Sequence, residues 1–389
     1  MPRSRWEWKK KSDTISPMRL TPYKRLLLFV TSALWFSAFA RTILPPYYLS
    51  QGITLYQMIV ATLIAFATQL IFLLTVRRIR AKPFWRLSMI ASFISLLLII
   101  QLASVWQYYL ASVFSGISMA TFWVAYNIAY FGATPKQKTG LGSAIMFSVF
   151  PMLNIIAPPL AGFIMQWNAL IFWVLSVLFF VVSYLFIARQ EDFSIKYSLA
   201  ASFSQLRATR VLIFLEGIWE ALPLAIIPVY TLYFIKTPLS YGAFAAYLSF
   251  IGVAANLLLG KMSDKLQKRV LFLYPLTLVL AITTFLFPQA TNNLALWLIV
   301  TGIMNFFLPL FWNTSTSMII DTHPNLDKAI PAREIVLAAG RVTGFILTII
   351  SFWLQPTPNG IFYVLGLIML SYPLYLWWVS RFQKKYAFR

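Results

Sequence analysis

The chain of 389 residues contains no cysteine and a single histidine, His323. The first absence excludes disulfides, thiolate metal sites and cysteine nucleophiles, and the second excludes a metal site built from several histidines. Charge is also scarce, because only 11% of the residues are charged while 60% are hydrophobic. Soluble domains have about 25% charged and about 45–50% apolar residues. A soluble enzyme, a disordered chain and a disulfide scaffold are therefore disfavoured.

Long apolar runs are what the sequence has instead. A transmembrane helix needs roughly 20 mostly apolar residues, and the chain offers twelve candidates. They lie at 26–47, 58–76, 87–103, 108–130, 142–165, 169–188, 211–235, 241–260, 270–288, 294–320, 334–355 and 360–380. Their apolar content is nearly continuous, unlike the alternation of a barrel strand. The prediction is an all-α integral membrane protein with twelve transmembrane helices, and no cofactor is expected.

The first span has a competing interpretation. Residues 26–36 resemble the apolar core of a signal peptide, and Ala38-Phe39-Ala40 resembles its cleavage site. A basic stretch of 25 residues precedes this run, and the run itself is long enough to span a membrane. Both features favour an uncleaved helix.

The net charge of +22 first suggests a nucleic-acid partner. If the N-terminus is cytoplasmic, however, 29 of the 32 Lys and Arg residues fall in seven cytoplasmic segments, and the exceptions are Arg41, Lys236 and Arg341. The positive-inside rule then predicts a cell (inner) membrane protein with both termini in the cytoplasm. The basic segments are expected to meet anionic lipid headgroups, and no nucleic acid is expected as a partner.

The longest connector divides the spans six and six, which suggests parallel repeats around a site near the membrane midplane. The predicted organisation is a basic cytoplasmic segment (1–25), an N-terminal six-helix bundle (26–188), a cytoplasmic linker (189–210), a C-terminal six-helix bundle (211–380) and a cytoplasmic tail (381–389).

The segment after the eighth span reads Gly-Lys-Met-Ser-Asp-Lys-Leu-Gln-Lys-Arg. It resembles the loop signature G-x-x-x-D-R/K-x-G-R/K-R/K of the major facilitator superfamily, with glutamine replacing the second glycine. The glycine is expected to end the helix, and the carboxylate to satisfy a neighbouring helix N-terminus. An ordinary solvated charge run is the alternative, but it does not explain the spacing of Gly and Asp. The resemblance implies a loop that latches one conformation during alternating access, formed by Gly260, Asp264, Lys265, Lys268 and Arg269.

Other parts of the chain match the family less well. The equivalent first-half loop, 77–86, keeps its positive charge but lacks the Gly and Asp, so the latch is expected to be lopsided. Ala157–Gly162 resembles the antiporter pattern G-P-x-x-G-G with two substitutions, and its small residues predict close helix packing. Ser112 occupies the place of an arginine that proton-linked members carry, which counts against a standard proton relay. The run from Arg333 to Arg341 is similar to that of uncharacterised bacterial members.

Four ionisable residues lie inside the predicted spans: Arg41, Glu216, Glu220 and Arg341. A charge at mid-bilayer costs about 2.5–3.5 kcal/mol on insertion scales, so these residues should pair, line water or titrate. Glu216 and Glu220 lie roughly 8 and 14 Å along the seventh span, and Arg341 lies roughly 10 Å along the eleventh. The i,i+4 spacing places both carboxylates on one face, where one of them is expected to hold a proton.

Two readings of these charges stay open. In the first, Glu220, helped by Glu216, accepts a proton or a cationic substrate group and releases Arg341 during the cycle. In the second, the glutamates and Arg341 form a fixed clamp within the C-terminal half. For Arg41, anion binding competes with snorkelling to the outer interface, and snorkelling is slightly favoured.

The family resemblance implies that the first, fourth, seventh and tenth spans line a central cavity. An aromatic wall with few amides suits a hydrophobic or amphipathic substrate, although lipid-facing aromatics are the alternative. Prolines at 223, 228 and 309 are expected to weaken the seventh and tenth spans. The candidate lining residues are Trp35, Trp123, Tyr126, Asn127, Trp219, Phe311, Trp312 and Asn313.

The sequence thus predicts a secondary transporter, expected to be a monomer, that moves a small organic solute by alternating access. Proton-coupled efflux is the specific expectation. No phosphate-binding loop is present, which disfavours ATP-driven transport. The alternatives are a lipid scramblase, a membrane enzyme using Asp321, His323 and Asp327, and a non-transporting sensor.

Overall fold

The computed structural model describes residues 22–133, 139–206, 209–265, 270–323, 325–354 and 359–382. Within these residues, twelve helical segments are long and apolar enough to cross a membrane. Each of them overlaps one of the twelve predicted spans, so the predicted all-α membrane fold is confirmed.

The first six spans form the N-terminal half. The first span is kinked, and the fifth is divided into two helices just before the Pro158-Pro159 pair. The elements are α1 (Pro22–Arg41), α2 (Leu44–Ser50), α3 (Leu55–Thr75), β1 (Arg78–Arg80), α4 (Ala81–Ile100), α5 (Val105–Ala133), α6 (Thr139–Asn154), α7 (Ala157–Trp167) and α8 (Ala169–Ile187).

A connector with a short strand and a short helix leads into the C-terminal half. The seventh span is interrupted by a π-helical turn, η2, that contains Pro223, as the prolines predict. The tenth span runs unbroken over Pro309. The elements are β2 (Ser194–Lys196), α9 (Leu199–Gln205), α10 (Arg210–Trp219), η2 (Leu222–Ile226), α11 (Ile227–Thr231), α12 (Pro238–Lys265), α13 (Val270–Ala290), α14 (Leu294–Thr322), α15 (Leu326–Leu354) and α16 (Gly360–Phe382).

Polar caps fix where three of the spans begin. Thr54 accepts from the Gln57 backbone at 3.2 Å, and Gln57 bonds back to the Thr54 backbone at 2.9 Å. Asn168 and Asn293 accept from backbone amides at the starts of α8 and α14. Each cap satisfies a donor that the first helical turn leaves unpaired. These three helices are therefore capped at their N-termini although none has an acidic residue in its first turn.

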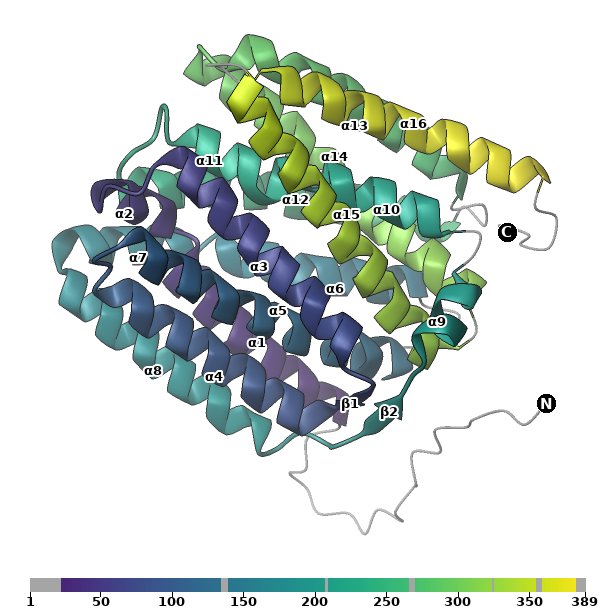
Figure 1. The fold of residues 1–389 in the computed structure, drawn as a ribbon, viewed down its shortest axis with the longest axis horizontal. Helices are drawn as coiled ribbons and strands as arrows, with labels where there is room; N and C mark the ends of the chain where they lie inside the picture. Colours follow the sequence, from purple (N-terminus) through teal and green to yellow (C-terminus); the bar gives the residue numbers. More distant parts are fainter. Residues whose placement is uncertain are drawn as a thin grey trace.

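The two halves meet along two seams. In Figure 1 the N-terminal half occupies the lower part and the C-terminal half the upper part, with α3 and α15 side by side between them. The second seam joins α6 and α7 to α12. There, a Cβ at Gly162 would overlap the Pro238 carbonyl, and one at Gly242 would overlap the Pro158 carbonyl. The small residues predicted to allow close packing in the fifth span do so.

Apolar side chains cover the outside of the bundle as well as its interior. One buried cluster, with the large side chains of Phe29 and Trp85, fills the N-terminal half and continues across the seam to residues such as Phe345. A second cluster, with Trp297 and Tyr372, lies in the C-terminal half. Large apolar residues also lie exposed along the spans, among them Ile71, Leu185 and Leu367. Such a surface is expected where lipid is the solvent.

We call the end of the bundle where α1 begins and α16 ends the basic end. There β1 pairs antiparallel with β2, so the connector after α8 joins the loop after α3. The Asp192 carboxylate accepts from the Lys82 backbone amide at 3.1 Å in the first turn of α4. Loop 77–86 lacks an acid of its own, and the connector supplies one at the helix N-terminus, where negative charge is stabilising.

Candidate functional site

Three of the four predicted intramembrane charges, Glu216, Glu220 and Arg341, gather where α10 packs on α15. The two backbones approach closely because glycines face one another. A Cβ at Gly217 would overlap the Leu337 carbonyl, and a Cβ at Gly340 would overlap the Phe214 carbonyl. Gly344 is equally close to Ile218. This glycine seam holds the two helices near enough for their charged side chains to pair across it.

Glu220 and Arg341 form the first pair. The Arg341 Nε donates to Glu220 Oε2 at 2.6 Å, and the Glu220 side chain is 2% exposed. The Arg341 guanidinium also lies 5.2 Å from the ring centre of Phe66, which belongs to α3 in the other half. Glu220 therefore has a partner of its own, and that partner contacts the N-terminal half.

Glu216 takes part in a second group, centred on Arg333. The Arg333 guanidinium donates to Glu216 Oε1 at 3.3 Å and to Glu334 Oε1 at 3.1 Å. The Ser315 hydroxyl donates to Glu216 at 3.0 Å, and Arg333 donates to Thr316 at 3.1 Å. All three ionisable side chains are buried, at 1%, 11% and 5% exposure for Glu216, Arg333 and Glu334.

Together these side chains form what we call the charged cluster: Glu216, Glu220, Arg333, Glu334 and Arg341. It holds three carboxylates and only two guanidiniums. Arg341 neutralises Glu220, whereas Arg333 is shared between Glu216 and Glu334. If every group is ionised, the cluster carries one surplus negative charge in a buried environment.

Arg333 and Glu334 were not predicted as site residues. The eleventh span was expected to begin at 334, which put Arg333 in a cytoplasmic loop. In the structure α15 begins at Leu326, so both residues lie inside the helix. The available signal was an adjacent acid and base next to the small-residue run Ala338-Ala339-Gly340.

Asn127 connects the charged cluster to the N-terminal half. Its amide Nδ2, on α5, donates to Glu334 Oε1 at 3.1 Å. Glu334 therefore accepts from its own half through Arg333 and from the other half through Asn127. Asn313, the second predicted amide, is buried on α14, with its Oδ1 3.5 Å from the Ser317 hydroxyl.

The predicted aromatic lining divides among different places. Trp219 and Phe311 point into the core of the C-terminal half, where the Trp219 indole donates to Thr284 at 3.1 Å and Phe311 packs on Tyr372. They do not face a central cavity in this structure. Trp312 is partly buried against the same core.

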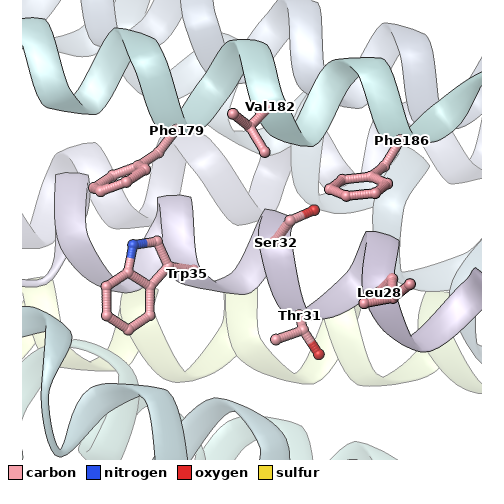
Figure 2. A pocket seen from close by; sticks show the side chains of 7 residues that line it. All are labelled: Leu28, Thr31, Ser32, Trp35, Phe179, Val182 and Phe186. Atoms are coloured by element: carbon pink, nitrogen blue, oxygen red, sulfur yellow. The ribbon is translucent and has the colours of Figure 1, made fainter.

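In the N-terminal half, Tyr126 is buried and packs against Trp123, with ring centres 5.9 Å apart. Trp35 lines an apolar groove of about 270 Å³ between α1 and α8, where it meets Phe179 edge-on (Figure 2). That groove lies within one half rather than between the two.

Arg41 does not snorkel outward. Its guanidinium donates to the Ser115 hydroxyl at 2.9 Å and to the Ser92 carbonyl at 3.2 Å. Both partners lie near the middle of α5 and α4, so the side chain points back into the bundle. The slight preference for snorkelling was wrong, because polar partners are available inside the N-terminal half.

The predicted latch loop differs from expectation at its start. Helix α12 continues through Gly260 to Lys265, so the glycine does not end the helix. Asp264 belongs to that last helical stretch. Lys268 and Arg269 lie outside the described residues. A latch at this loop stays a prediction.

Comparisons with known proteins agree with this architecture. The chain is similar over 92% of its length to the whole of the human organic anion transporter MFSD10 (TETRAN), with a TM-score of 0.64 and 13% identity. It is similar over 93% of its length to 99% of a bacterial metal transporter, with a TM-score of 0.63 and 13% identity. No curated protein sequence matches it. The family model of the Major Facilitator Superfamily matches residues 26–325, which is well over half of the chain, so the protein belongs to that superfamily.

Proposed function

We propose that the protein is a proton-coupled secondary transporter that exports a small hydrophobic or amphipathic organic solute. The proton site is the group formed by Glu216, Arg333 and Glu334. Family and fold support a secondary transporter. Proton coupling rests on the arrangement of charge inside the bundle.

The observation that carries the proposal is the surplus carboxylate of the charged cluster. Arg333 faces two carboxylates, while Arg341 is committed to Glu220. A buried carboxylate without a counter-charge is far more costly than the same group with a proton. One proton shared by Glu216 and Glu334 makes the cluster neutral.

This assignment moves the proton from Glu220, where one of the two sequence-based readings placed it, to Glu216 and Glu334. Glu220 and Arg341 then act as the fixed clamp, because their contact at 2.6 Å is a one-to-one pair. The role of proton acceptor is thus assigned to the group of Glu216, Arg333 and Glu334, and the role of fixed clamp to Glu220 and Arg341.

Coupling to transport follows from the bond between Glu334 and Asn127. An ionised carboxylate accepts a hydrogen bond about twice as strongly as a neutral group. Ionised Glu334 therefore holds α5 against α15, and protonated Glu334 holds it less tightly. Proton occupancy would change the stability of the closed interface between the halves, which is what alternating access requires.

The substrate class is supported more weakly. The aromatic residues Trp123 and Tyr126 near Asn127 favour a solute with apolar surface. One structural neighbour carries organic anions and the other carries metal, according to their descriptions. The charges of these two substrates are opposite, so the likeness in fold does not select one of them.

The test needs a ligand, and thermal stabilisation of the purified protein by pooled metabolites and drugs supplies one. Accumulation is then measured in proteoliposomes with an imposed pH gradient. We expect Glu216→Gln, which removes the surplus carboxylate and leaves Arg333 paired with Glu334, to exchange substrate but to lose pH-driven accumulation. Glu191→Gln is the matched control, because Glu191 is an exposed acid paired with Arg25 at the basic end. Undiminished pH-driven accumulation by Glu216→Gln would remove the proposed proton site.

Labelling of an introduced thiol from each side of the membrane distinguishes a transporter from a scramblase, an enzyme or a sensor. The chain has no cysteine, so a single introduced cysteine is the only thiol. Thr314→Cys lies on α14 next to Asn313. In a transporter, adding ligand should increase labelling of this thiol from one side of the membrane and decrease labelling from the other side. Thr314 is buried in this structure, so a thiol that stays sealed from both sides, with and without ligand, would contradict alternating access at this position.

A further inference from the structure

Acidic side chains are missing from the N-terminal half, so the charge that its helices place in its interior is positive. Residues 22–188 contain no aspartate and no glutamate. Arg41 is the basic residue whose side chain turns into that half, toward the middle of α4 and α5. No carboxylate of the described residues lies within ion-pair distance of it. Its counter-charge is therefore not supplied by the surrounding helices.

The contacts of Arg41 satisfy hydrogen bonds without satisfying charge. A serine hydroxyl and a backbone carbonyl accept from its two terminal nitrogens, at 2.9 and 3.2 Å. Both acceptors are neutral. They hold the guanidinium in a fixed direction inside an apolar bundle, where an unneutralised cation is costly. A mobile anion at this place would remove that cost.

The structure has room for such an anion beside the guanidinium. A cavity of about 80 Å³ lies between α1, α4 and α5, and Arg41 forms part of its wall. Its other polar lining residues are serines: Ser37, Ser88, Ser92 and Ser118. The cavity is large enough for a small ion, and it is much smaller than the roughly 300–1,000 Å³ pockets that bind organic ligands.

The serines form a chain of hydroxyls across this cavity. The Ser88 and Ser118 hydroxyls lie 3.1 Å apart, and the Ser118 and Ser92 hydroxyls lie 3.0 Å apart. The Ser88 hydroxyl donates to the Ser118 backbone carbonyl at 2.9 Å, so the hydroxyls that can rotate to donate to an anion are those of Ser37, Ser92 and Ser118. Apolar side chains, among them Met119 and Trp123, complete the wall. One fixed positive charge, several hydroxyl donors and a small volume suit a monovalent anion that sheds its water easily.

We propose that Arg41 and these serines bind a small monovalent inorganic anion of the halide class within the N-terminal half. The site is separate from the charged cluster, and it does not depend on proton coupling. The bound anion neutralises Arg41 and stabilises the packing of α1 on α4 and α5. Because the anion binds the folded protein, its concentration raises the apparent stability.

The experiment measures the melting temperature of the purified protein at constant ionic strength, while chloride replaces gluconate. Gluconate is too large for the cavity. We expect a saturable rise with chloride in the wild type and none in Arg41→Gln. Arg41→Lys keeps the charge but loses the two-point anchoring, and should need roughly ten times more chloride for half saturation. Arg25→Gln, at the basic end, is the matched control and should behave as the wild type.

Equal melting temperatures of the wild type in chloride and in gluconate would overturn the proposal. A full chloride response in Arg41→Gln would also overturn it, because the binding would then lie elsewhere. If Arg41→Gln does not fold, the lysine variant decides. An unchanged half-saturating concentration in that variant contradicts the site, and a raised one supports it.

Discussion

Replacement of Arg333 by glutamine removes the guanidinium that lies between Glu216 and Glu334. Both carboxylates are then left without a cation in a place where their side chains are 1% and 5% exposed. Removing one partner of a buried ion pair typically costs about 3–5 kcal/mol, and this range applies because all three side chains are buried. The hydrogen bond from Arg333 to Thr316 is lost as well.

The same reasoning gives a very different result for Glu216→Gln. That substitution removes the surplus negative charge and leaves Arg333 paired one-to-one with Glu334. Ser315 can still donate to the amide oxygen, so we expect a cost below about 1 kcal/mol. The double variant Glu216→Gln/Arg333→Gln should recover about 0.5–3 kcal/mol relative to Arg333→Gln alone, which is the usual size of coupling between contacting residues.

The assay is reversible unfolding of the protein in lipid bicelles at neutral pH, with the three variants and the wild type side by side. The decisive quantity is the difference between the two single variants. If Glu216→Gln costs as much as Arg333→Gln, then Glu216 is a fully ionised partner that Arg333 needs. The idea of a surplus carboxylate would then be refuted.

Three further predictions concern neighbouring features. Glu220→Gln should cost about 3–5 kcal/mol in the same unfolding assay, because Arg341 loses its one carboxylate partner among the described residues; a loss below 1 kcal/mol would contradict the clamp. Gly340→Val should prevent α10 and α15 from approaching and lower the yield of folded protein in size-exclusion profiles, whereas Gly132→Val, where a Cβ meets open space, should not. Asp192→Asn should cost about 0.3–1 kcal/mol through the lost charge at the start of α4, and an unchanged melting temperature would show that its bond to Lys82 is not stabilising.

The spans were predictable because each one needs only a sustained apolar run, and such runs are visible without any contact information. The sequence also predicted that an acid of the seventh span pairs with Arg341, but depth along the helix did not identify which one. At about 1.5 Å per residue Arg341 was expected nearer to Glu216 than to Glu220, because that depth was counted from residue 334, whereas α15 begins at Leu326 and Arg341 pairs with Glu220.

The direction in which a side chain points was harder to predict. Arg333 and Glu334 precede the apolar run, so hydropathy placed the start of the eleventh span at 334. The helix begins earlier, at Leu326, and both charged side chains find partners inside the bundle. Phe311 lies on α14, a helix that is apolar on nearly all sides, and periodicity cannot then identify the face that packs on its own half. The inward direction of Arg41 was not predictable either, because its partners Ser92 and Ser115 lie far from it in the sequence.

The central claim is that Glu216 and Glu334 share a proton in the folded protein at neutral pH. Infrared spectroscopy of the protein in lipid tests this directly, because a protonated carboxylic acid has a C=O stretching band that an ionised carboxylate lacks. We predict a band from a buried protonated carboxyl that shifts in heavy water, disappears in Glu216→Gln and persists in Glu191→Gln. A band that is absent from the wild type at neutral pH, or that remains unchanged in Glu216→Gln, would contradict the account.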